Sequence, residues 1–309
     1  EKFLSQLLGF SPIVGILGQR QTGKTTLVSK VSAEYVTLDE PEFLELALRD
    51  PKLLITDRKR PFGIDECQES PVLFPVLKEW VRTHGARGQF ILTGSVRFTS
   101  VEEIKESLTG RMVELELLPL CMSETERLPL FDIQKLAAGN RPLELLKANP
   151  LASAKYYACA TEFLLKGGLP GICFTRNSAV RARQFRTHIK TILDRDLRKV
   201  TRTQLDYLTL KSFLEEIALQ QGEIFDLARA ARAVRIAPNT AKKILFGLES
   251  VFLIRSIFKS GGTAGRILYF EDQGIATFLL QERGIQQEEV EPRISDWSRL
   301  LFQQLYAQL

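Results

Sequence analysis

The chain has 309 residues, of which 44% are hydrophobic and 26% charged, a balance typical of a globular protein with two or three domains. No apolar run approaches the roughly 20 residues needed to cross a bilayer, so no membrane partner is expected. The opening residues lack a signal-peptide layout, and the four cysteines are widely spaced without a CxxC pair. We therefore expect reduced thiols and a cytoplasmic location.

Net charge is unevenly distributed along the chain. Residues 1–150 carry 19 Lys and Arg against 21 Asp and Glu, whereas residues 151–309 carry 23 against 16. The second half therefore holds the whole positive excess. This asymmetry fits a nucleic-acid or other polyanion partner, and a solvated basic surface explains it equally well.

Apolar runs alternate with helical patterns in the first part of the chain. Strands are expected at 11–17, 35–38, 61–66, 89–95 and 112–117, and helices at 24–31, 39–49 and 72–83. Strands that alternate with helices favour a parallel sheet covered on both faces. We expect this α/β domain to occupy residues 1–125.

The later pattern is mainly helical. We expect a helical linker or lid region at 126–202, which ends in one long basic helix at 180–202. Residues 203–309 are expected to form a winged-helix domain and the start of a further region. Its elements are helices at 205–221, 224–234 and 239–253, then a hairpin at 258–270 with a glycine-rich tip.

A phosphate-binding loop is predicted where the first strand meets the first helix. The segment matches the pattern G-x4-GK-[ST], and the preceding strand and following helix supply the context that the pattern needs. Backbone N–H groups of such a loop surround phosphates, the lysine contacts the β- and γ-phosphates, and the threonine hydroxyl binds Mg²⁺. The predicted nucleotide-binding residues are Gly18, Gln19, Arg20, Gln21, Thr22, Gly23, Lys24, Thr25 and Thr26.

Two carboxylates follow the expected strand at 61–66. Asp65 at the strand end is predicted to hold Mg²⁺, together with Thr25. Glu66 would face the attacking water and act as general base. This pair favours hydrolysis of ATP over simple nucleotide storage.

Polar groups near two further strands complete the predicted site. Thr93 and Ser95 end the strand at 89–95, where a hydroxyl could orient water or touch the γ-phosphate. Arg111 precedes the strand at 112–117 on the expected nucleotide side, and either stabilises transition-state charge, in cis or across a subunit contact, or forms a structural salt bridge. Arg20 either caps a neighbouring element or approaches phosphate.

Together these residues resemble a family of bacterial and archaeal AAA+-type ATPases. The family motifs G-x-R-x-x-GKT, I-D-E-x-Q, L-T-G-S and S-L-x-G-R are similar to segments 18–25, 64–68, 92–95 and 107–111 of this chain, in the same order and spacing. The resemblance implies a P-loop ATPase fold with ATP and Mg²⁺ as ligands.

The second half resembles the domain of uncharacterised function that follows the ATPase in that family. The similar segments are 167–170, 194–197, 248–254 and 269–274. Family members commonly continue into a nuclease-like region opened by a Leu-Phe-Glu-Asn-like helix. Here the matching stretch is Leu301-Phe302-Gln303-Gln304, without the spaced acidic cluster of a nuclease, so nuclease activity is not expected of these residues.

Three helices followed by a hairpin outline a winged helix. Its turn and cap are expected at 237–240, and the following helix would be the recognition helix. The predicted phosphate contacts are Lys242, Lys243, Lys259 and Arg266. That helix also has core-like residues, so the element can instead serve packing or regulation. The basic helix at 180–202 could equally face a polyanion or pair with the acidic first half.

The leading hypothesis is an Mg²⁺-dependent ATPase whose hydrolysis switches a winged-helix domain. The alternative is a nucleotide-responsive DNA-binding or regulatory module with little turnover. A P-loop kinase is disfavoured by the Asp65-Glu66 pair and by the absence of an obvious lid insertion. ATP and ADP are the expected small partners, and duplex DNA, a protein partner and an oligomer are left open.

Overall fold

The computed structural model describes residues 2–100, 108, 110–127, 154–258, 265–285, 298–299 and 302–303. The chain forms two compact units, the first made of Glu1–Leu117 with Ser250–Phe252, and the second of Leu118–Glu249 with Leu253–Leu309. Among the described residues, no helix combines the length and apolar character needed to cross a membrane. The four cysteines, all of them described, form no disulfide.

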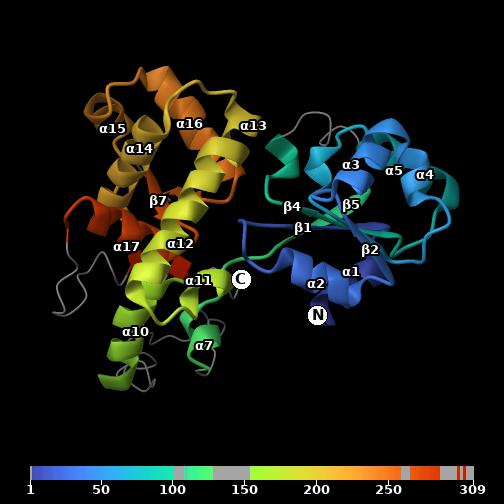
Figure 1. Ribbon diagram of the computed structural model, residues 1–309, viewed down its shortest axis with the longest axis horizontal. Helices are drawn as coiled ribbons and strands as arrows, with labels where there is room; N and C mark the ends of the chain where they lie inside the picture. The colour runs from blue at the N-terminus through green and yellow to red at the C-terminus, as the bar shows by residue number, and fades with distance from the viewer. Residues whose placement is uncertain are drawn as a thin grey trace. The chain divides into compact units, whose positions relative to one another are not determined.

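A five-stranded parallel sheet forms the centre of the first unit (Figure 1). The strand order is β2-β3-β4-β1-β5, with bounds Glu34–Thr37, Phe62–Asp65, Phe90–Gly94, Ile13–Leu17 and Met112–Glu116. The central strand β1 pairs with β4 on one side and β5 on the other. Because all strands run in the same direction, their carboxyl ends meet at one edge of the sheet, where open α/β sheets bind ligands.

Helices cover both faces of this sheet. The helices of the first unit are α1 (Lys2–Phe10), α2 (Lys24–Val31), α3 (Pro41–Arg49), α4 (Pro51–Ile55) and α5 (Leu73–His84), with short 3₁₀ turns η1 (Cys67–Glu69) and η2 (Phe98–Ser100). Figure 1 shows α1 and α2 on one face of the sheet and α3, α4 and α5 on the other. The predicted parallel sheet with helices on both faces is therefore confirmed.

The side chains of β1 point alternately to the two faces of the sheet and contribute to a hydrophobic core on each face. Ile13 and Leu17 belong to a buried cluster that also contains residues of α5, whereas Val14 and Ile16 pack with Val28 of α2. Successive strand residues point to opposite faces, so one apolar run feeds both layers. This is why the strand at 13–17 contains no polar side chain, instead of alternating between apolar and polar residues.

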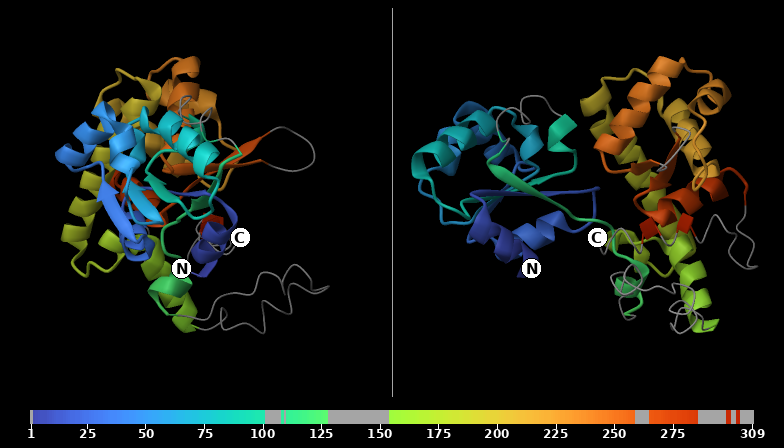
Figure 2. Two further views of the ribbon diagram at one scale, coloured as in Figure 1. Left: turned by 90° about the vertical axis from the view of Figure 1, so that its right-hand side faces the viewer. Right: turned by 180° about the vertical axis from the view of Figure 1, so that it is seen from behind.

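The second unit is mainly helical. Its described elements are α7 (Met122–Thr125), α10 (Ala154–Lys166), α11 (Pro170–Cys173), α12 (Ser178–Thr191), the π-helical turn η4 (Ile192–Asp196), α13 (Leu197–Thr201), α14 (Tyr207–Leu219), α15 (Leu227–Ala233), α16 (Pro238–Ser250), β6 (Ile254–Phe258), β7 (Arg266–Phe270) and α17 (Gln273–Glu282). Figure 2 shows these helices and the β6–β7 hairpin from two further sides.

Three predictions for this unit need correction. The long helix at 180–202 contains the π-helical turn η4, so it is continuous but not uniformly α-helical. The helix expected from residue 224 begins at Leu227, because Ile224 instead forms a β-bridge with Ile267. The hairpin begins at Ile254 and not at 258, since Ile254–Phe258 pair antiparallel with β7. Its predicted glycine-rich tip lies outside the described residues.

Two distant segments of this unit meet at one buried carboxylate. Asp272 caps α17 and accepts hydrogen bonds from the backbone N–H groups of Gly168 (2.5 Å) and Leu169 (3.1 Å). A Cβ on Gly167 would lie 2.2 Å from Asp272 Oδ1. Burial raises the pKa of Asp272 to about 6, against the opposing effect of these donors. The segments 167–170 and 269–274 singled out in the sequence therefore have a shared structural role.

Candidate active site

The predicted phosphate-binding loop connects β1 to α2. Gly23 and Gln21 have positive φ values of 97° and 66°, which turn successive N–H groups toward one side of the loop. A Cβ on Gly18 would lie 2.2 Å from the carbonyl oxygen of Leu117. The loop can therefore follow this path only with glycine at position 18.

Lys24 is folded inside this loop. Its side chain is buried, and Nζ donates hydrogen bonds of 2.8 Å to the carbonyl oxygens of Gly18 and Gln19. The Thr22 hydroxyl donates to Gln19 O at 2.9 Å and tightens the same turn. Lys24, Thr25 and Thr26 form the first turn of α2, so the ammonium group lies where the helix N-terminus already favours anions.

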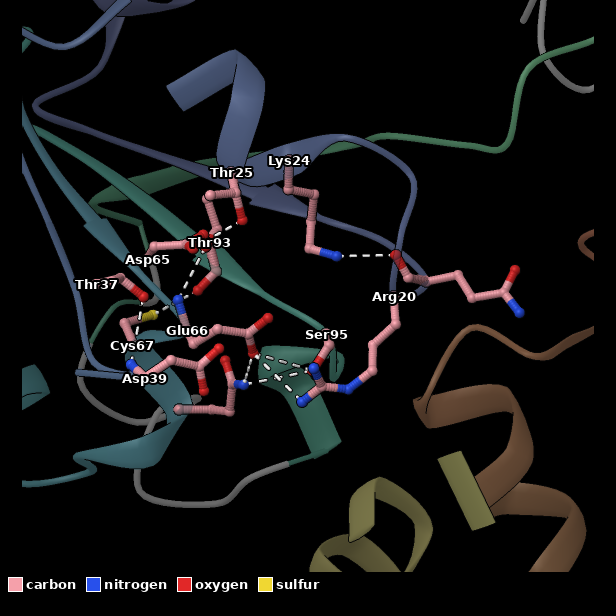
Figure 3. Close-up of polar contacts among 12 residues, drawn as sticks. Arg20, Lys24, Thr25, Thr37, Asp39, Asp65, Glu66, Cys67, Thr93 and Ser95 are labelled. Carbon is pink, nitrogen blue, oxygen red and sulfur yellow. Dashed lines mark hydrogen bonds and ion pairs between the residues drawn. The ribbon is translucent and has the colours of Figure 1, made fainter. Parts of the chain in front are cut away.

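Asp65 ends β3 and accepts hydrogen bonds from three hydroxyl groups, of which those of Thr25 and Thr93 can be followed in Figure 3. Its Oδ2 accepts from Thr25 Oγ1 at 2.8 Å and from the Tyr35 hydroxyl at 3.1 Å. Its Oδ1 accepts a short hydrogen bond from Thr93 Oγ1. The carboxylate is 2% exposed, so these donors compensate for its removal from water and fix its orientation.

Glu66 follows in a left-handed backbone conformation, with φ 53° and ψ 40°. This conformation is costly for a residue with a Cβ, by about 1–2 kcal/mol, and such strain clusters at functional sites. The Glu66 N–H donates to Thr93 Oγ1 at 3.0 Å, which ties the turn to β4. The turn places the Glu66 and Asp65 side chains beside each other at the same edge of the sheet.

The Glu66 carboxylate is held by groups from three elements (Figure 3). Its Oε2 accepts from Ser95 Oγ at 3.2 Å and from Gln68 Nε2 in a short hydrogen bond. Arg20 of the phosphate-binding loop lies 4.0 Å from the same oxygen. Arg20 therefore connects the loop to Glu66, while the capping role and the phosphate contact considered from the sequence remain predictions.

These residues fit ATP with Mg²⁺. The loop supplies N–H donors and a lysine for phosphate oxygens, and the glycine at 18 is sterically required. Thr25 and Asp65 supply two oxygen ligands 2.8 Å apart, the ligand chemistry that Mg²⁺ prefers. Across the described residues, no group of three or more His, Cys, Asp or Glu side chains is arranged as a metal site. Such a small number of protein ligands is sufficient for Mg²⁺, because the ion keeps several water ligands and also binds substrate phosphates.

Arg111 does not join this group within one chain. It directly precedes β5, whose Met112 pairs with Ile13 at the amino end of β1, and the Ser11 hydroxyl donates to the Arg111 carbonyl oxygen at 3.3 Å. The phosphate-binding loop follows the opposite, carboxyl end of β1. That end is roughly 16 Å from the amino end, because β1 has five residues with a rise of about 3.3 Å each. The expected place on the nucleotide side is therefore wrong. Action across a subunit contact and a structural salt bridge both remain predictions for Arg111.

Two residues of the site had no role in the sequence prediction. Tyr35 on β2 donates to Asp65, and burial together with the Asp65 charge raises its pKa. Gln68 follows Glu66 by two residues and donates to it, while its own Oε1 is buried without a hydrogen-bond partner among the described residues. The adjacency of β2 and β3 could have indicated Tyr35, but the order of strands in the sheet was not fixed by the sequence.

The predicted nucleic-acid contacts belong to the second unit. Lys242 and Lys243 are exposed on α16, Arg266 is partly exposed on β7, and Lys259 lies outside the described residues. The basic helix α12 differs, because Arg186 pairs with Glu282 (2.7 Å) and Lys190 with Asp194 (2.5 Å). These two cations thus pair with acids of their own unit, a third arrangement beside the two considered from the sequence.

The sheet, its flanking helices and the loop after β1 define a P-loop NTPase fold. Residues 10–126 are similar to the AAA domain family, which supports assignment of the first unit to the P-loop ATPases. Residues 160–286 are similar to a domain of unknown function (DUF8612).

Two curated relatives are uncharacterized proteins of Mycobacterium bovis and Mycobacterium tuberculosis, each 28% identical over 316 residues. The match covers 99% of this chain and 65% of each relative, so the chain spans about two thirds of their length. Among solved structures, the Walker-type ATPase of Pyrococcus abyssi is 15% identical, with 90% and 93% of the two chains covered and a TM-score of 0.47. The DNA clamp loader delta protein of Bacillus subtilis is 12% identical, with 99% of both chains covered and a TM-score of 0.28.

Proposed function

We propose that the chain binds and hydrolyses ATP in an Mg²⁺-dependent reaction. The observation that carries the proposal is the hydrogen bond between Thr25 of the phosphate-binding loop and Asp65 of β3, which joins the two predicted Mg²⁺ ligands at one sheet edge. Glu66 is the adjacent residue and serves as general base. Bound Mg²⁺ would neutralise charge on the phosphates.

The other residues of the site orient these groups. Lys24 exchanges its bonds to the loop carbonyls for the β- and γ-phosphates. Thr93 holds Asp65 and the Glu66 N–H together through one hydroxyl, and Ser95 orients the Glu66 carboxylate. Thr93 lies on β4, the strand between β1 and β3, and Ser95 directly follows that strand. This strand therefore aligns the loop with the base.

The Glu66→Gln variant tests the chemistry directly. It keeps the size of the side chain and one acceptor oxygen, but it removes the basic carboxylate. We expect it to bind ATP as the parent does and to lose turnover by about 100-fold or more. Steady-state release of phosphate and binding of a fluorescent ATP analogue provide the two readouts. Turnover at the parent rate would show that Glu66 is not the base.

We further propose that hydrolysis changes the conformation of a winged-helix domain formed by residues 207–270. Helices α14, α15 and α16 are followed by the β6–β7 hairpin, and Ile224 between α14 and α15 bridges Ile267 of β7. Phe225 N–H also donates to Arg266 O at 2.9 Å. This order, a helix, an isolated β-bridge, two helices and a hairpin, supports the winged-helix interpretation.

Hydrogen exchange can test the switch. The Glu66→Gln variant with ATP and the parent with ADP would be compared, with protection measured for peptides from residues 207–270. We expect a difference in those peptides between the two nucleotides. Identical protection throughout the segment would contradict a switch while leaving hydrolysis intact.

A second candidate is a nucleotide-responsive regulatory module with little turnover. The observation in its favour is that Glu66 Oε2 already contacts Gln68, Ser95 and Arg20, which restrains the carboxylate. Under this alternative the parent binds ATP but releases phosphate no faster than Glu66→Gln. Parent turnover well above that of the variant would exclude it.

A further inference from the structure

The segment from the start of α15 to Leu248 of α16 is rich in cations and contains no acids. Residues 227–248 include Arg229, Arg232, Arg235, Lys242 and Lys243, with no Asp or Glu. All five side chains are exposed, and none forms an ion pair with any described residue. These five cations, on two helices and the four-residue turn that joins them, create a strongly positive surface.

Packing fixes which side of α16 faces outward. Ala241, Leu245 and Leu248 are buried, whereas Lys242 and Lys243 are exposed. On the buried side, a Cβ on Gly247 would lie 2.2 Å from Thr201 Cγ2, so α16 packs closely against α13. This close packing prevents α16 from rotating, and it holds the two lysines on the solvent side near the helix start.

Arg235 occupies a position that favours glycine. It lies two residues after the end of α15 with φ 57°, and the hydrogen bonds Arg235 N–H to Arg232 O and Ile236 N–H to Ala231 O close the helix end. Glycine is the usual residue at such a left-handed position because a Cβ is strained there. A long cationic side chain at this point departs from local preference, which is expected where a residue has a functional role.

We propose that the winged-helix domain binds duplex DNA through this surface. The amino-terminal half of α16 enters the major groove, where Lys242 and Lys243 contact the phosphates along its edges. Arg229, Arg232 and Arg235 contact the flanking phosphates. A helix-turn-helix presents its second helix in this way, and the major groove of B-form DNA admits a helix. The deep and narrow major groove of A-form RNA does not, so duplex RNA is the poorer ligand.

Direct titration tests the surface without knowledge of a target sequence. The probe is a fluorescein-labelled duplex of arbitrary sequence and about 25 base pairs, because phosphate contacts are independent of sequence. Fluorescence anisotropy with the full chain, without nucleotide, gives affinity at several salt concentrations. We expect binding that weakens steeply as salt rises. The assay does not depend on ATP hydrolysis, so the two proposals can fail separately.

Two charge-removal variants locate the contacts. Lys242→Ala/Lys243→Ala should weaken binding about 10-fold or more and reduce the salt slope by nearly 2, since each phosphate contact contributes about 0.9. The matched control Arg176→Ala/Arg183→Ala removes the same charge from exposed residues elsewhere in the second unit. The control should change affinity and slope much less than the lysine variant does.

The Arg235→Gly variant distinguishes a loss of DNA contact from a loss of folding stability. Glycine suits the left-handed backbone there, so the melting temperature should not fall, while DNA affinity should drop several-fold. Any one of four results would overturn the proposal. The parent could show no salt-sensitive binding at low salt, or the lysine variant and its control could lose affinity equally. Arg235→Gly could keep the parent affinity, or duplex RNA of the same sequence could bind as tightly as DNA.

Discussion

Lysines occupy opposite environments in the two units. Lys24 is 4% exposed, and its ammonium group is held between two carbonyl oxygens of the loop. Lys242 and Lys243 lie on the exposed face of α16. The charge of Lys24 in the first unit is buried and held in place, whereas the charges on α15 and α16 are exposed to solvent.

The difference indicates two modes of anion recognition. A buried cation in a fixed cradle acts in a low dielectric, so one residue carries a large and specific interaction energy. Exposed cations are screened by salt and act additively on an extended polyanion. Substitutions in the first unit should therefore have large, local effects, and those on α15 and α16 small, cumulative ones.

The largest effect is expected from Lys24→Ala. Loss of two charge-assisted hydrogen bonds to phosphate should reduce ATP affinity by about 100-fold or more, at about 1.5–3 kcal/mol each. Titration with a fluorescent ATP analogue measures this. Lys30→Ala on the same helix is the control, because Lys30 is exposed in the last turn of α2. If both variants bind ATP equally well, the loop is not the nucleotide site.

Asp65→Asn should have the next largest effect. The amide keeps the shape of the side chain but loses the charge that holds Mg²⁺, so turnover should fall by roughly 100-fold and half-saturation should need more Mg²⁺. Phosphate release measured across an Mg²⁺ titration gives both quantities. Asp39→Asn, an exposed control beyond β2, should behave as the parent. An unchanged Mg²⁺ dependence in Asp65→Asn would remove Asp65 from the metal site.

Gln68→Ala should have a moderate effect. Gln68 donates to the Glu66 carboxylate, so its removal leaves the base less well oriented. Turnover should fall about 10-fold, the value of one hydrogen bond to a charged group, while KM for ATP should stay near that of the parent. Gln68→Asn, with a shorter amide, should restore part of the rate. A rise in KM with an unchanged rate would indicate a role in ATP binding instead of orientation.

Much of the first unit was predictable because its motifs act through backbone chemistry. Gly18, Gly23 and Lys24 specify a loop whose geometry follows from their order, and an apolar run before Asp65 predicts a buried strand with a carboxylate at its end. The helix expected at 24–31 has those bounds in the structure. Local residue order determines these features, so the sequence pattern was sufficient.

Features that depend on long-range pairing were not predictable. The sequence prediction placed Arg111 at the wrong edge of the sheet. Because β5 pairs parallel to β1, the amino end of β5, which Arg111 precedes, lies far from the loop. The bridge between Ile224 and Ile267 joins residues 43 positions apart, so no local pattern indicates it. The contact of Arg20 with Glu66 likewise depends on the strand order.

Tyr35→Phe should have the smallest effect at the site, and it tests how far the positioning of Asp65 depends on β2. Asp65 keeps the Thr25 and Thr93 hydroxyls when the Tyr35 hydroxyl is removed. The Mg²⁺ concentration for half-maximal turnover should therefore rise only about threefold, with little change at saturation. The same Mg²⁺ titration measures it, and Thr93→Val provides the comparison because it removes a more central hydroxyl. If Tyr35→Phe costs as much as Thr93→Val, β2 contributes as much as β4 to holding the carboxylate.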